Sequence, residues 1–259
     1  MRLMSKKVLP TKFPDAAAVS YSRAIQKMIL ALGKETLALY EKHIEPGLQS
    51  RSDTQQYEQD GIFNDIGKML FFLSVAVKKI FTPNKKERAA KSFLSNVNRF
   101  NKHNIEQQMR VKGIELPSRE AWLIPFMDNK IKENVSYITT IADDYLDDVE
   151  KIVREGVNSG ITAKQLVDRV KVTESRAQFI AVDQTGSILG QMTAERHQSI
   201  GIDKFQWDTS GDERVRDSHR ELDGKIFSYD APPTVGGRKV LPGEDYRCRC
   251  VAIPVFDND

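Results

Sequence analysis

The chain has 259 residues, of which 40% are hydrophobic and 29% are charged, so it can bury a sizeable core and is not an intrinsically disordered protein. Its formal net charge of +3 is too small to indicate a nucleic-acid-binding protein by itself. Two cysteines cannot build a secreted disulfide scaffold, and no apolar run of signal-peptide length follows Met1, so we expect a protein made in the cytoplasm.

The first half of the chain is predicted to be helical. Apolar residues recur at helical spacing from residue 15 to about 50, where Pro46-Gly47 is expected to end the helix. A polar link at 49–60 leads to an apolar helix over 62–81. Its uncharged core runs only from Met69 to Val77, shorter than the ~20 residues that a membrane span needs, so it is predicted to be buried in protein. An amphipathic helix then begins near Ser92 and closes at Gly113.

Three further helices and a few short strands are predicted after Pro117. The first helix runs from Trp122 to about residue 156. The second begins at a capping box formed by Thr162 and Gln165. Thr173 is expected to cap the third, which reaches Gly201 and carries Asp183, Gln184, Arg196 and His197 on its polar face. Short runs at 204–207 and 250–253 are then typical of strands.

These elements predict a mainly α protein with two parts. Residues 1–115 form a helical N-terminal region. Residues 116–259 form a small α+β C-terminal domain that is helical to about residue 201 and then consists of short strands and loops. A basic stretch in the first part is interpreted as a solvated helix face, with contact to DNA as the alternative. Its members are Lys85, Lys86, Arg88, Lys91, Arg99, Lys102, Arg110 and Lys112.

The C-terminal segment contains a candidate metal site. Cys248 and Cys250 place both thiols on one face of a strand, and His219 can supply a third ligand. Zinc is the metal expected for thiolate and imidazole ligands. The candidates for a fourth ligand are Asp183, Asp217 and Asp223. Alternatively, both cysteines are small buried hydrophobic residues and His219 bonds to a loop carbonyl.

A zinc-dependent hydrolase or deaminase is an alternative function for the same segment. His219-Arg220-Glu221 followed by Cys248 and Cys250 is similar to the H-x-E…P-C-x-x-C layout of zinc deaminases, in which the glutamate transfers protons. Here the cysteines are one residue too close, and no proline directly precedes the first. We therefore expect Glu221 to be an exposed loop residue.

Arg214 and Arg216 are interpreted as structural residues. They alternate in a segment, 213–217, that is predicted to be extended, so both guanidinium groups lie on one side and can pair with carboxylates. The candidate partners are Asp183, Asp212 and Asp245. Contact with a phosphate is the alternative. The glycines and prolines of the segment are interpreted as turn formers.

A long ordered pattern covers this segment and the helix before it. Its positions are Asp183, Gln184, Trp207, Asp212, Arg214, Arg216, His219, Asp223, Gly224, Pro242, Gly243, Cys248 and Cys250. The pattern closely resembles the C-terminal signature of the phage Mu F-like head morphogenesis family, and the similarity extends back through Tyr145 to Trp122. The family commonly has an arginine before the Asp-Gln pair, where this chain has Val182.

The resemblance implies a structural protein without catalytic residues, whose signature positions stabilise a compact C-terminal domain. The function it implies is that of a minor capsid protein of a tailed bacteriophage, located in the virion at the head interior or the portal vertex. The expected partners are the portal protein and the major capsid protein, with non-specific contact of the basic stretch to packaged DNA. Residues 1–115 would then contact the portal or capsid, unless their aromatic side chains only form the core. These side chains are Phe71, Phe72, Phe93 and Phe100.

Overall fold

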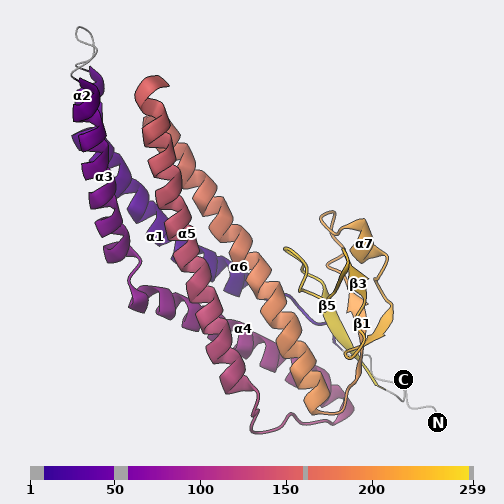
Figure 1. Ribbon diagram of the computed structural model, residues 1–259. Helices are drawn as coiled ribbons and strands as arrows, with labels where there is room; N and C mark the ends of the chain where they lie inside the picture. The colour runs from indigo at the N-terminus through magenta and orange to yellow at the C-terminus, as the bar shows by residue number, and fades with distance from the viewer. Residues whose placement is uncertain (1–8, 50–57, 160–162, 257–259) are drawn as a thin grey trace, which may run out of the picture. The chain divides into compact units, whose positions relative to one another are not determined.

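A computed structural model describes residues 9–49, 58–159 and 163–256 of the chain (Figure 1). Long helices dominate, and short antiparallel strands follow near the C-terminus, which confirms the predicted fold class. The helices that precede the strands are α1 (Asp15–His43), α2 (Glu45–Gln49), α3 (Glu58–Ile80), α4 (Pro83–Lys112), α5 (Leu123–Ser159) and α6 (Ala163–Ser199). Among the described helices, we find none with the length and apolar character that a membrane crossing requires.

Two helix boundaries in the first half differ from the prediction. Pro46 and Gly47 lie inside α2 instead of ending a helix, because proline is tolerated in the first turn. Helix α4 begins at Pro83, well before Ser92, for the same reason. It ends before Gly113, whose φ of 73° is the left-handed conformation that often terminates helices. Most of the predicted link at 49–60 lies outside the described residues.

Helix α6 is one continuous helix where two were predicted. Thr162 lies outside the described residues, so its capping box is not described. The Thr173 hydroxyl donates to the carbonyl oxygen of Arg169 one turn earlier, at 3.0 Å, and is therefore satisfied within the helix instead of capping a new one. Arg196 and His197 were expected on a polar face, but both are fully buried.

The chain divides into two compact units. Unit 1 comprises Met1–Tyr21, Lys91–Ile131 and Phe179–Asp259, and unit 2 comprises Ser22–Ala90 and Lys132–Gln178. The boundaries between the units fall within α1, α4, α5 and α6. The boundary expected from the sequence, between residues 115 and 116, stays a prediction.

Among the residues described, unit 2 consists of helices joined by short links and contains no strand. Its core includes Ile25, Leu32, Ile66, Leu73 and Tyr145, all almost completely buried. The Tyr145 hydroxyl donates to Thr36 Oγ1 at 3.0 Å, which gives this buried polar group a partner.

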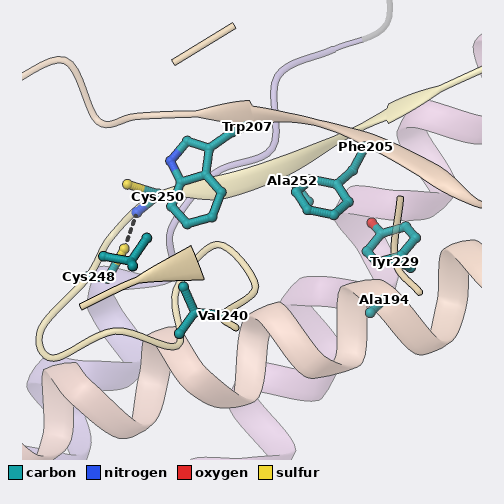
Figure 2. Close-up of a cluster of buried hydrophobic side chains, with 9 residues drawn as sticks. Ala194, Phe205, Trp207, Tyr229, Val240, Cys248, Cys250 and Ala252 are labelled. Carbon is teal, nitrogen blue, oxygen red and sulfur yellow. Dashed lines mark hydrogen bonds between the residues drawn. The ribbon is translucent and has the colours of Figure 1, made fainter. Parts of the chain in front are cut away.

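Unit 1 contains the sheets. Strands β1 (Lys204–Asp208), β2 (Ile226–Ser228) and β5 (Val251–Val255) form an antiparallel sheet in the order β2-β1-β5, and β3 (Thr234–Val235) pairs with β4 (Arg238–Lys239). The strands predicted at 204–207 and 250–253 correspond to β1 and β5. Side chains from this sheet, from the loops and from Ala194 of α6 form one buried hydrophobic cluster (Figure 2).

Candidate metal centre and its supporting loops

His219, Cys248 and Cys250 come together in unit 1. His219 lies on the short helix α7 (Asp217–Arg220), and the cysteines immediately precede β5. The Nδ1 atom of His219 is 3.4 Å from Cys248 Sγ and 3.5 Å from Cys250 Sγ. All three residues are at most 4% exposed. Among the described residues they are the one group of three or more metal-binding side chains whose ligand atoms lie within 4.8 Å of one another.

The cysteines belong to the hydrophobic cluster of the small sheet. Figure 2 shows both beside Trp207, with the backbone N–H of Cys250 donating to Cys248 Sγ at 3.3 Å. The Trp207 ring meets the imidazole of His219 edge to face, with 5.6 Å between the ring centroids. The candidate ligands are therefore packed against the core and have little freedom to move.

The two thiols are electrostatically different. The pKa of Cys248 is held below its ordinary value by the hydrogen bond with Cys250 and, after that, by His219. The pKa of Cys250 is raised by the same contact with Cys248 and by burial. The pKa of His219 is raised, chiefly by its hydrogen bond with Cys248. The arrangement thus favours a negative charge on sulfur next to the imidazole, the form in which cysteine binds metals.

Asp245 connects the cluster to two arginines. One carboxylate oxygen is 3.0 Å from His219 Nε2 and 2.9 Å from Arg216 Nη1, and the other is 3.0 Å from Arg238 Nη2. The Asp245 side chain is only 13% exposed, so these contacts are partly shielded from water. Arg216 also donates to the carbonyl oxygen of Tyr246 at 2.6 Å. The carboxylate therefore fixes the ring orientation of His219.

Asp212 is the second carboxylate that joins separate loops. It forms an ion pair with Arg214 at 3.1 Å and another with Arg249, the residue between the two cysteines. The Asp212 carboxylate also accepts from the backbone N–H of Arg214 at 3.0 Å. Residues 213 and 214 form a turn that leads into α7, so the prediction of an extended 213–217 segment is wrong. The carboxylate pairing predicted for Arg214 and Arg216 is present.

Asp223 and Gly224 hold the turn between α7 and β2. The Asp223 carboxylate accepts from the backbone N–H and the hydroxyl of Thr209, at 2.8 and 2.9 Å. Gly224, with a φ of 73°, donates its backbone N–H to the carbonyl oxygen of Trp207 at 2.8 Å. These signature positions therefore stabilise the chain path around the sheet.

Pro242 and Gly243 pack directly on α6. A Cβ atom at Gly186 would lie 2.5 Å from the Cys248 carbonyl oxygen, and one at Gly190 would lie 2.4 Å from that of Pro242. The same helix presents Asp183, whose carboxylate accepts the Arg247 backbone N–H at 3.0 Å. Glycines one turn apart thus let the loop backbone touch the helix.

Asp183 and Gln184, the signature residues on α6, do not need the arginine that the family commonly has at the position of Val182. Asp183 bonds to backbone, and its neighbour Gln184 is only 5% exposed. Val182 therefore leaves no unpaired carboxylate at Asp183.

The carboxylates considered as a fourth metal ligand lie elsewhere. Asp183 bonds to Arg247, Asp217 to Arg220, and Asp223 to Thr209. Glu221, which the deaminase alternative needs, is exposed. The structure therefore groups three of the proposed ligands and separates the rest.

Sequence reasoning missed two features of unit 1. Arg238 was not singled out, because an arginine next to a Gly-Gly turn carries no pattern of its own. Arg196 was assigned to a solvated face, but it makes a two-pronged ion pair with Glu120, at 2.6 and 2.9 Å. Arg196 also lies over the Trp122 ring, and no local pattern in the sequence indicates either contact.

The C-terminal part of the chain is similar to a known family and to several known proteins. Residues 144–253 match the family described as Phage Mu protein F like protein. The chain is 43% identical over 130 residues to an uncharacterized protein of Haemophilus influenzae, a match that covers 49% of this chain and 28% of the relative. It is 29% identical over 114 residues to an NAD(+)–arginine ADP-ribosyltransferase of Enterococcus faecalis, covering 40% of this chain and 23% of the relative.

An uncharacterized protein of Methanocaldococcus jannaschii is 32% identical over 111 residues, which is 41% of this chain and 17% of the relative. The chain thus spans less than a third of the length of each of these relatives. No solved structure gives a significant match. The family resemblance inferred from the signature is confirmed over residues 144–253, whereas Trp122 precedes the matched range. Residues 144–253 are therefore similar to the Phage Mu protein F like family.

Proposed function

We propose that this protein is a minor structural protein of the head of a tailed bacteriophage, bound at the portal vertex and acting in head assembly or DNA passage. The observation that carries the proposal is the match of residues 144–253 to the Phage Mu protein F like family. The ion pairs of two carboxylates in the C-terminal segment support it. Asp212 and Asp245 are engaged in linking loops to one another, as a scaffold requires.

The geometry favours this function over a zinc hydrolase or deaminase. A general acid or base must lie within hydrogen-bond reach of the reacting group. Glu221 is exposed, whereas His219, Cys248 and Cys250 are buried. Asp245, which hydrogen-bonds to His219, is also bound by two arginines.

The surface we propose for the portal protein lies on α3 in unit 2. Phe63 and Phe71 are 48% and 63% exposed, and they lie eight residues apart with the exposed Gly67 midway. Phe71 also packs edge to face on Phe72, which is itself 45% exposed. Exposed aromatic residues that gather on one surface are typical of protein interfaces. Phe93, by contrast, is buried and stacks on Tyr21, and therefore belongs to the core.

We also propose that the basic stretch of α4 contacts packaged DNA. Lys85, Arg88, Lys91 and Arg99 of the basic stretch are exposed along α4. Such contact would be non-specific and would weaken steeply as the salt concentration rises.

Co-purification with the portal protein of the encoding phage or prophage tests the proposal. The full chain and the portal protein are co-expressed, crosslinked and analysed by mass spectrometry. We expect crosslinks from lysines near α3, and we expect Phe71→Ser to reduce recovery of the portal at least tenfold. Ile226→Ser, which removes an equally exposed apolar side chain from β2, is the matched control and should leave recovery unchanged. Equal recovery with both variants would reject α3 as the contact surface, and no recovery with the unaltered chain would reject portal binding.

A further inference from the structure

We propose that His219, Cys248 and Cys250 bind one zinc ion, through Nδ1 of the imidazole and both Sγ atoms. This inference stands apart from the proposed head function. The three atoms converge from two separate segments, 29 residues apart between His219 and Cys248. In tetrahedral zinc sites, with Zn–S of ~2.3 Å and Zn–N of ~2.0–2.1 Å, adjacent nitrogen and sulfur ligands lie about 3.5 Å apart. The two N–S distances here are 3.4 and 3.5 Å.

The second nitrogen of His219 supports the assignment. Histidines that bind metals usually donate their other ring N–H to a carboxylate, which fixes the tautomer and the ring orientation. His219 Nε2 lies 3.0 Å from Asp245, so Nε2–H can donate to the carboxylate and Nδ1 can give its lone pair to a zinc ion held by the two sulfur atoms. Arg216 and Arg238 hold the carboxylate in place. Asp245, Arg216 and Arg238 thus act as positioning residues for a metal ligand.

The donor set selects the kind of metal. Two thiolates and one imidazole suit zinc, whereas magnesium and calcium prefer oxygen ligands. Among the described residues, no fourth side chain belongs to the group. Because the three ligands are almost completely buried, the remaining position suits a small ligand such as water.

A metal ion would also explain how so small a sheet is held together. Strands β2, β3 and β4 contain only two or three residues each. A zinc ion would link α7 to the segment before β5 and close the intervening loop. Closing a loop in this way lowers the entropy of the unfolded chain and adds the binding free energy to folding.

The test begins with the metal content of the purified full-length protein. We expect about one zinc ion per chain after dialysis against metal-free buffer. Zinc is then exchanged for Co²⁺, whose thiolate complexes absorb in the near ultraviolet. Because the chain has only two cysteines, such absorption must come from Cys248 and Cys250. Cys248→Ser and Cys250→Ser should each weaken this absorption, and the double variant should abolish it.

His103 supplies the matched control, because it is an exposed histidine outside the group. His219→Gln should lower the zinc affinity by at least tenfold, while His103→Gln should bind zinc like the unaltered protein. Asp245→Asn should keep the thiolate absorption and lower the affinity roughly 10- to 100-fold, as expected of a residue that only positions the ligand. Equal affinity of all four proteins would overturn the assignment.

A measurement on the unaltered chain covers the case in which the variants fail to fold. The protein is prepared metal-free under reducing conditions, and its Tm and the reaction of its thiols with a thiol reagent are followed as Zn²⁺ is added. We expect Tm to rise and both thiols to become protected at about one equivalent of zinc. If neither changes and no Co²⁺ absorption develops, the three residues form a hydrogen-bonded thiol–imidazole group and the metal site does not exist.

Discussion

Gly186 of α6 and Gly243 of the loop between β4 and β5 are in direct backbone contact. A Cβ atom on Gly186 would lie 2.6 Å from the Gly243 carbonyl oxygen, and one on Gly243 would lie 2.4 Å from that of Gly186. Gly243 also has a φ of 98°, which side-chain-bearing residues rarely adopt. This contact holds the loop that carries Cys248 against the helix, so the position of the candidate metal ligands depends on it.

Gly186→Ala should therefore destabilise the protein. The added methyl group meets two backbone carbonyl oxygens that cannot move aside like a flexible side chain, and we expect a loss of at least ~1–3 kcal/mol. Gly67→Ala on α3 is the control, because its site is exposed and a Cβ there has open space. That variant should gain up to ~1 kcal/mol from helix propensity. Urea denaturation of both measures the difference, and equal stabilities would contradict the close contact.

The buried ion pair of Arg196 with Glu120 gives a second prediction. Arg196 is fully buried and its guanidinium group also donates to Asn98 and Asn101, at 2.6 and 2.5 Å. Glu120→Ala leaves this buried cation without its carboxylate, and we expect a loss of about 3–5 kcal/mol in the free energy of unfolding.

Glu150→Ala is the matched control for that variant. Glu150 pairs with Arg154 at 2.6 Å, but both side chains are about half exposed, so the loss should stay below about 0.5 kcal/mol. Chemical denaturation compares the two, and a Glu120→Ala effect as small as that of Glu150→Ala would show that Arg196 is not buried as described.

His197 predicts a loss of stability in acid. Burial lowers its pKa from 6.5 to about 3, and its Nδ1 atom lies 2.5 Å from the Tyr229 hydroxyl. The unfolded chain takes up this proton near pH 6.5, whereas the folded protein does so only near pH 3. Lowering the pH through this window therefore favours unfolding, by up to about 1.4 kcal/mol per pH unit from this group alone.

The contribution of His197 is isolated by substitution. His197→Asn keeps a polar atom near Tyr229 but has no titration in this range, so it should remove this part of the pH dependence. The free energy of unfolding is measured between pH 4.5 and 7 for the unaltered protein and for His197→Asn, and its slope against pH is compared. Identical slopes in both proteins would mean that His197 titrates as an exposed histidine.

The fold was largely predictable because the apolar periodicity of long helices is a strong local signal. Some helix boundaries were predicted wrongly, because the same residue type can either end a helix or lie within one. Pro46 was expected to end a helix and the next amphipathic helix was expected to begin near Ser92, but α2 and α4 each have a proline in the first turn, where proline is tolerated. Thr173 was taken as a cap, but its hydroxyl bonds within the helix.

The candidate site was predictable in part. His219, Cys248 and Cys250 are unusual residues in this chain, so their chemistry stands out. The burial of Arg196 was not predictable, because its partner Glu120 lies 76 residues away and no local pattern joins the two. The role of Asp245 in joining His219 to Arg238 likewise arises only from the tertiary path of the loops.

Quantitative mass spectrometry of purified virions, from the phage or prophage that encodes the chain, tests the proposal that this is a minor head protein. We predict that the protein is present in a few copies per particle, far fewer than the major capsid protein, and that crosslinking joins it to the portal. Its absence from mature and immature particles, with the portal and capsid proteins present, would contradict the claim.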